Sequence, residues 1–308
     1  MSTGRNSSSR IQPRTRIKFW GVRGSIPTPG PTTVFYGGNT SCIEVRAGDQ
    51  IIILDAGTGL RGLGRELVSE FDGEPLQITL LLTHTHWDHI QGLPFFLPVY
   101  KPENRLRILG YKGARLGLHN ILTGQMESPF FPIGLRKVPA NVTIKELKEY
   151  EFDIGDVRVR ACRANHPGNC VGYRLFTRGG SVAFFPDNEL REKRGLLLRG
   201  TGGKAPMRAS VSVEQMAEFL RGTDALIMDT QYDLPEYKIH AGWGHGCLDD
   251  VVAMAMKAQV KWLFLFHHDP DHDDTKIKGM ISHARKLVKK AGAGLQVEAA
   301  REGLTVEL

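Results

Sequence analysis

Apolar and polar residues alternate with a period of two along much of the chain, which is the spacing of a β-strand with one buried face. The pattern predicts strands at 15–20, 42–47, 51–55, 78–83, 106–110, 157–162, 171–176 and 181–185. Two continuous apolar runs, 225–228 and 262–266, are typical of fully buried strands. Helical spacing predicts helices near 88–98, 212–221, 248–258 and 276–290. The mixture indicates an α/β protein.

Two helix boundaries carry their own signals. Ser212 followed by Gln215 predicts a capping box, and Gly292 predicts a helix end. The order of strands and helices does not distinguish a doubly wound sheet from a sandwich, so periodicity leaves the architecture open.

The length of 308 residues fits one large domain or two small ones. Candidate chemistry is spread from residue 84 to residue 267, so neither half could hold a site alone. We therefore expect a single domain over 15–308, preceded by a disordered basic tail at 1–14 that is rich in Ser and Arg.

Cellular location is predicted from what the sequence lacks. The tail has no apolar core of a secretory signal, and no apolar run approaches the length of a membrane span. The four cysteines are scattered, without C-x-x-C spacing, so we expect reduced thiols. Together these features predict a cytoplasmic protein that is not embedded in a membrane.

The net charge of +7 is concentrated in two places. Residues 1–18 contain five basic and no acidic residues, which leaves 35 basic against 33 acidic residues in the rest of the chain. Segment 191–208 has six basic residues and one acid, Glu192. A basic loop over a site would favour a phosphate-bearing substrate, and an ordinary solvated loop explains the charges equally well.

The strongest chemical signal is an H-x-H-x-D-H cluster, His84, His86, Asp88 and His89, directly after the apolar run 78–82. In an extended segment His84 and His86 point to the same side and can share one ion. After a turn, Asp88 and His89 can face a second ion. Imidazole and carboxylate donors suit zinc, manganese or iron rather than calcium. The alternative is a surface histidine cluster with Asp88 as a helix cap.

Three more donors each follow a strand-like run: His166, Asp229 and His267. Ligands carried on loops at one edge of a sheet are a frequent way to build a site. Strand alternation sends the rings of His267 and His268 to opposite sides, so only one of them can face a site at this edge. The family resemblance described next implies that it is His267. We expect His268, His272 and the acidic residues from 269 to 274 to form a solvated loop, with some acids at the amino end of the next helix.

In these motifs the sequence resembles the metallo-β-lactamase-fold hydrolases, over nearly the whole chain from about Arg16. The resemblance implies a four-layer αβ/βα sandwich. It also implies that one metal is held by His84, His86 and His166, and the other by Asp88, His89 and His267, with Asp229 bridging. Asp187 is a candidate to orient a histidine ligand, with a turn-forming aspartate as the equal alternative, and Trp87 is expected to pack beneath the site.

A second resemblance involves the segment 242–246, with His245, which is similar to the Gly-His-Ser/Thr element of the ribonuclease Z and PhnP-like phosphodiesterase branch. In that branch, of which this chain resembles an uncharacterised bacterial subgroup, the histidine lies near the scissile phosphate. The chain departs from the pattern with Gly246 and Cys247 after the histidine, and His240 competes for the same role.

These resemblances imply metal-assisted hydrolysis of a phosphodiester, such as a cyclic nucleotide, an RNA or a small metabolite. Two divalent ions, zinc first with manganese or iron as alternatives, would activate water. Asp88 would take the proton of the water, and His245 would stabilise the phosphate or protonate the leaving oxygen. A carboxyl ester, thioester or lactone hydrolase and a non-catalytic binding scaffold are the rival hypotheses. The branch also suggests a homodimer.

Overall fold

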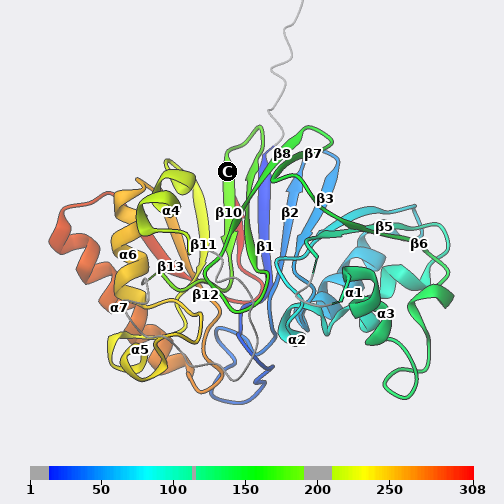
Figure 1. Ribbon diagram of the computed structural model, residues 1–308, viewed down its shortest axis with the longest axis horizontal. Coiled ribbons are helices and arrows are strands. Elements are labelled where there is room, and N and C mark those ends of the chain that lie inside the picture. Colours follow the sequence, from blue (N-terminus) through cyan, green and yellow to red (C-terminus); the bar gives the residue numbers. More distant parts are fainter. Residues whose placement is uncertain (1–13, 113–115, 191–209) are drawn as a thin grey trace, which may run out of the picture.

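The computed structural model describes residues 14–112, 116–190 and 210–308, and these form two seven-stranded sheets that face each other (Figure 1). The first sheet has the order β14-β1-β2-β3-β4-β5-β6 and the second β13-β12-β11-β10-β9-β8-β7. The strands of the first sheet are β1 (Thr15–Gly21), β2 (Cys42–Ala47), β3 (Gln50–Leu54), β4 (Gln77–Leu81), β5 (Arg105–Gly110), β6 (Asn141–Glu146) and β14 (Thr305–Glu307). Those of the second are β7 (Glu151–Ile154), β8 (Val157–Arg163), β9 (Val171–Phe176), β10 (Ser181–Phe185), β11 (Ala225–Asp229), β12 (Trp262–Phe266) and β13 (Gln296–Ala299).

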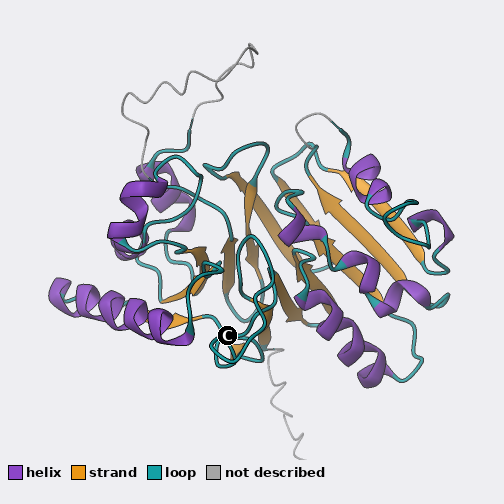
Figure 2. Cartoon of the chain, turned by 90° about the horizontal axis from the view of Figure 1, so that it is seen from below, coloured by secondary structure: helices purple, strands orange, loops and turns teal. Residues whose placement is uncertain are grey.

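Helices cover the outer face of each sheet, as Figure 2 shows from below. The described helices are α1 (Gly59–Phe71), α2 (Trp87–Ile90), α3 (Leu118–Gly124), α4 (Val213–Leu220), α5 (Leu234–His240), α6 (Leu248–Lys257) and α7 (Asp274–Ala291), with short 3₁₀ turns at Leu93–Phe95, Leu97–Tyr100 and Leu135–Lys137. Between the sheets lies a shared apolar core, in which the ring centroids of Phe19 and Phe264 are 5.4 Å apart. The four-layer αβ/βα sandwich is thus confirmed.

All the strands predicted from alternation and apolar runs are present, with ends that agree within two residues. The helix predicted at 88–98 is wrong in length, because only α2 is helical and two 3₁₀ turns follow it. Pro94 and Pro98 lack the N–H that a continuing α-helix needs. Helix α1 was not predicted: its three glycines disfavour a helix, yet Leu60, Leu63 and Leu67 are buried at helical spacing.

The two predicted helix boundaries are confirmed. The Ser212 side chain accepts a hydrogen bond from the backbone N–H of Gln215, whose side chain in turn accepts one from Ser212. Gly292 ends α7 in the left-handed region, with φ of 62°.

Parallel strand pairs place the chemistry at one edge of the sandwich. Strands β3 to β6 run parallel to one another, and so do β10 to β13. The carboxyl ends of parallel strands meet at a common edge, and ligands bind there in open α/β sheets. The segments after β3, β4, β8, β10 and β12 carry the acids and histidines described next, together with the last residue of β11.

Four further expectations concern other parts of the chain. The predicted tail at 1–14 lies outside the described residues except for Arg14, which pairs with Glu307 at 2.8 Å, and the basic segment 191–208 also lies outside them. No disulfide bond joins the four cysteines, all of which lie within the described residues. No helix in the described parts is both long and apolar enough to cross a membrane.

Candidate metal centre

The donors predicted from the H-x-H-x-D-H motif lie where β4 leaves the first sheet. His84 and His86 are in the extended segment after the strand, and α2 begins at Trp87, which places Asp88 and His89 in its single turn. Asp88 and His89 are buried. The change from extended chain to helix therefore turns the two halves of the motif in different directions, as predicted.

A first set of donors consists of His84, His86, His166 and Asp187, whose ligand atoms all lie within 4.8 Å of one another. The Nε2 atom of His166 is 3.1 Å from Nδ1 of His86. The Oδ2 atom of Asp187 is 3.4 Å from Nε2 of His166 and 3.6 Å from Nε2 of His84. Three imidazole rings and one carboxylate thus direct ligand atoms toward one position.

A second set consists of Asp88, His89 and His267. The Oδ2 atom of Asp88 is 3.0 Å from Nε2 of His89 and 3.2 Å from Nε2 of His267. The second oxygen of Asp187, Oδ1, lies 3.1 Å and 3.3 Å from the same two nitrogens. Asp187 therefore faces both sets, one oxygen to each.

This geometry exchanges the roles expected for the two aspartates. Asp229 is buried at the end of β11, but its carboxylate accepts hydrogen bonds from the backbone N–H groups of Asn188 and Gln231, at 3.1 and 2.9 Å, and faces His245. Asp187, not Asp229, lies between the two sets. Both residues end up at the same sheet edge because β10 and β11 are parallel neighbours, so placement after a strand could not separate them.

Asp55 is a site residue that the sequence motifs did not predict. It follows β3 with φ of 60°, is fully buried, and its Oδ2 lies 2.7 Å from Nδ1 of His89. The same carboxylate accepts hydrogen bonds from the Thr83 hydroxyl, whose oxygen is 3.1 Å from Nδ1 of His84. The sequence feature that could have predicted Asp55 is its position directly after the apolar run 51–54. Strained backbone at such a residue is typical of functional sites.

Two further contacts hold the rings of His166 and His267. The carbonyl of Gly244 accepts from Nδ1 of His166 at 2.9 Å, and Oε1 of Gln231 accepts from Nδ1 of His267 at 3.0 Å. A ring that donates its Nδ1 proton keeps the lone pair on Nε2 directed at the cluster. Four histidines are thereby fixed in tautomer and orientation.

The electrostatics of the cluster divide its members into neutral and charged groups. Burial lowers the pKa of His84, His86 and His166, so these rings are neutral near pH 7. Burial opposes ionisation of Asp88 and Asp187, but the surrounding histidines hold the pKa of each carboxyl well below its usual range. The centre therefore combines neutral imidazoles with ionised carboxylates.

His89 shows that this position favours a cation. Burial alone would lower its pKa, yet Asp88, Asp187 and Asp55 raise the pKa well above the ordinary value. Three carboxylates thus share one small buried volume.

The donor set fits divalent metal ions. Three buried polar atoms within it, Nε2 of His84, Nε2 of His89 and Oδ1 of Asp187, have no hydrogen-bond partner among the described residues. Each such atom costs about 1–3 kcal/mol when unsatisfied, and cations bound in the two donor sets would satisfy all three. Imidazole nitrogens with carboxylate oxygens are the donors preferred by zinc and related divalent ions.

His245 borders the centre, whereas His240 points away from it. The His245 ring stacks on His267 with centroids 5.0 Å apart, and its Nδ1 is 3.0 Å from Oδ2 of Asp229. Burial lowers its pKa, but Asp229 outweighs this and raises the pKa to about 9. His240 instead stacks on Tyr232 and directs Nδ1 to the carbonyl of Glu236 at 2.9 Å. The geometry thus favours His245 over its competitor.

Two expectations about neighbouring residues are wrong. Trp87 does not pack beneath the site, since its side chain is 82 % exposed at the surface. His268 and His272 are buried rather than solvated: His268 donates from Nε2 to the Ala300 carbonyl at 2.9 Å, and burial lowers its pKa to about 3. The acids of this segment behave as expected where Asp273 caps α7.

The chain is similar in sequence to a known family. Residues 50–268 match the family described as the beta-lactamase superfamily domain. Ribonuclease Z from Pyrococcus horikoshii is 30 % identical over 295 residues, which cover 85 % of this chain and 89 % of that protein.

Solved structures agree on the fold. The metallo-beta-lactamase fold protein YhfI from Bacillus subtilis aligns with a TM-score of 0.66 at 16 % identity, over 96 % of this chain and 100 % of that one. A diphosphatase from the PhnP family aligns with a TM-score of 0.63 at 17 % identity, over 96 % and 98 % of the two chains. With its donor clusters at the sheet edge, the chain belongs to the beta-lactamase superfamily and is a metal-dependent hydrolase of that family.

Proposed function

We propose that the protein is a phosphodiesterase that uses two divalent ions. The observation that carries the proposal is the position of Asp187, which directs one oxygen to each donor set, beside a histidine that Asp229 keeps protonated. A relative named ribonuclease Z and a structural neighbour named a diphosphatase support a phosphate ester as substrate.

For the ligands, we assign His84, His86 and His166 to one ion and Asp88, His89 and His267 to the other, with Asp187 shared. Zinc is the ion we propose, and manganese or iron would accept the same donors. Such ions supply an activated water near neutral pH and offset negative charge on the phosphoryl oxygens.

The chain's own residues then have distinct tasks. Asp88 is ionised, and the backbone N–H of Ser25 fixes its Oδ2 at 2.8 Å, so this carboxylate is placed to accept the proton of the attacking water. The protonated ring of His245 donates Nδ1–H to Asp229, which leaves its Nε2–H to stabilise a phosphoryl oxygen or to protonate the leaving oxygen.

The substrate remains one of the predicted phosphodiesters: a cyclic nucleotide, an RNA or a small metabolite. A protonated histidine next to the ions favours a dianionic transition state over the single developing charge of a carboxyl ester, thioester or lactone. The homodimer and the cytoplasmic location stay predictions.

The test compares initial rates on a chromogenic phosphodiester, a carboxyl ester and a lactone, using zinc- or manganese-reconstituted protein. Phosphodiester cleavage that is lost in Asp187→Ala and falls about 10²-fold or more in His245→Ala supports the proposal. Preferred cleavage of the ester or lactone, or equal losses on all substrates in His245→Ala, would reject it in favour of the rival hydrolase.

A further inference from the structure

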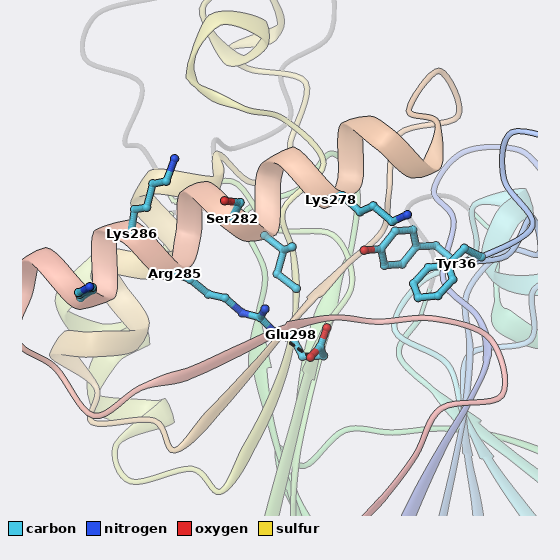
Figure 3. A pocket seen from close by; sticks show the side chains of 9 residues that line it. Tyr36, Lys278, Ser282, Arg285, Lys286 and Glu298 are labelled. Carbon is cyan, nitrogen blue, oxygen red and sulfur yellow. Dashed lines mark hydrogen bonds and ion pairs between the residues drawn. The ribbon is translucent and has the colours of Figure 1, made fainter.

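A second candidate site lies outside the metal centre, in an open groove between α7 and the turn that contains Phe35 and Tyr36 (Figure 3). The groove has a volume of about 500 Å³. Nine residues line it: Phe35, Tyr36, Lys278, Ile281, Ser282, Arg285, Lys286, Lys289 and Glu298. Four basic side chains and two aromatic rings thus face one volume.

The positive charge of the groove is local. In the described parts of the chain 31 Lys and Arg residues face 32 Asp and Glu residues, so the described surface carries no general excess of positive charge. One acid, Glu298, lines the groove, and it pairs with Arg285 at 2.9 Å. Lys278, Lys286 and Lys289 are exposed and, among the described residues, form no ion pair. These lysines are available to an anionic ligand.

The aromatic end of the groove is held rigidly. The backbone N–H groups of Phe35 and Tyr36 donate to the Asp274 carboxylate at 2.9 and 3.1 Å, and the Phe35 ring packs edge-on against Tyr36 at 4.9 Å. Even so, Phe35 is 54 % exposed, with the Lys278 ammonium 5.2 Å from its ring centroid. An exposed ring beside cations is the arrangement on which nucleobases stack in single-strand binding proteins.

The groove and the metal centre are connected along the chain. A single loop joins them: its Ser25 N–H donates to Asp88, and further along the loop Tyr36 lies 5.7 Å, ring to ring, from His268, the neighbour of His267.

We propose that this groove binds a single-stranded RNA segment that flanks the cleaved phosphodiester, with phosphates on Lys278, Lys286 and Lys289 and a base on Phe35. The proposal rests on the phosphodiesterase function and narrows its substrate class to an oligonucleotide. Lysine contacts to a single strand make affinity fall with salt by about 0.7 logarithmic units per phosphate neutralised.

Binding is measured by stopped-flow anisotropy of a fluorescein-labelled single-stranded RNA of ~12 nucleotides on zinc-loaded protein, at several salt concentrations. The groove variant is Lys278→Gln/Lys286→Gln/Lys289→Gln. The control, Lys101→Gln/Lys145→Gln/Lys148→Gln, makes the same charge change at exposed positions around β5 and β6, on the other sheet. Phe35→Leu tests the aromatic contact, thermal melts check folding, and a small chromogenic phosphodiester reports on the metal centre.

The RNA affinity of the groove variant should fall about tenfold or more, and the slope of its log affinity against log salt should become shallower by about 2. The RNA affinity of Phe35→Leu should fall about fivefold. The control variant should match the wild type, and all proteins should cleave the chromogenic substrate equally. The proposal would be overturned if the wild type did not bind RNA, or if the groove and control variants lost affinity equally. It would also be overturned if the groove variant lost binding to phosphatidylserine vesicles while its RNA affinity stayed unchanged. Absent chromogenic cleavage by the wild type would instead reject the phosphodiesterase function, independently of binding.

Discussion

Two buried aspartates, Asp187 and Asp229, follow or end neighbouring strands yet differ in what their oxygens contact. Asp229 accepts two backbone N–H groups and faces His245, so its charge is already compensated by the protein. Asp187 faces four histidine nitrogens, and its Oδ1 has no hydrogen-bond partner among the described residues. The carboxylate without protein donors is the one a cation would bind.

Asp187→Asn should therefore abolish binding of at least one of the two ions and lower kcat/KM about 10³-fold or more, because the neutral amide keeps the shape of the side chain and removes its charge. Metal content per chain, measured by mass spectrometry after gel filtration, checks this. Asp229→Asn is the matched control and should keep its metal. Equal metal loss in the two variants would contradict the assignment of Asp187.

Asp55 acts on the centre through two histidines. It contacts His89 directly, and it reaches His84 by way of the Thr83 hydroxyl. Asp55→Asn should weaken metal affinity about 10- to 100-fold, the usual effect of losing a carboxylate behind a ligating histidine. Competition with a chromogenic chelator gives the affinity. Asp49→Asn, in an exposed turn, makes the same chemical change and should leave the affinity unaltered; an unchanged affinity in Asp55→Asn would remove Asp55 from the site.

At the scale of elements, the loop after α5 carries both Gly244 and His245, and Glu189 holds it in place. The Glu189 carboxylate accepts from the N–H groups of Gly242 and Gly244, at 2.8 and 3.1 Å, and from the Tyr237 hydroxyl. It is buried, so each of these bonds lies in a low-dielectric environment. The loop is thus anchored from β10's exit, next to Asp187.

Glu189→Gln should lower the free energy of unfolding by about 1–3 kcal/mol, because one amide cannot accept from all three donors. It should also lower kcat while the metal content stays at the wild-type value. Denaturant titration, steady-state kinetics and metal analysis together check this. Glu218→Gln, on the exposed side of α4, serves as the control. Loss of metal in Glu189→Gln would show that the residue supports the ligands rather than the loop.

On the scale of the whole molecule, the metal centre joins the two sheets. His84 to His89 follow β4 of the first sheet, while His166, Asp187 and His267 follow β8, β10 and β12 of the second. Ions bound by both groups would tie the halves of the sandwich together. Without cations, the close carboxylates and the unsatisfied polar atoms oppose this packing.

Removing the ions with a chelator should lower Tm by several degrees. Ligand present at 1,000 times its Kd stabilises the folded state by about 4 kcal/mol, and each kcal/mol moves Tm by about 2–4 °C in proteins of 150–250 residues. Calorimetry before and after chelation, followed by zinc addition, checks the change and its reversal. An Asp187→Asn protein, which lacks at least one ion, should show a smaller shift, and a shift as large as in the wild type would argue against a shared carboxylate.

Much of this molecule was determined by the sequence itself. Period-two alternation and two continuous apolar runs located the strands that form the centre of both sheets, because burial of a strand is a local property of consecutive residues. The capping box at Ser212 and the stop at Gly292 are equally local. The H-x-H-x-D-H motif gathers four donors within six residues, so its convergence needs no long-range contact.

Only the tertiary structure decided which distant residues complete the centre. Asp187, Asp229 and Asp55 all follow apolar runs, and nothing local separates one that faces two histidine clusters from one that accepts backbone N–H groups. The same holds for His245 and His240, which are separated by a turn of glycines. These choices depend on strand order and on the directions of chain segments that meet from both sheets, and that information resides in the packed fold.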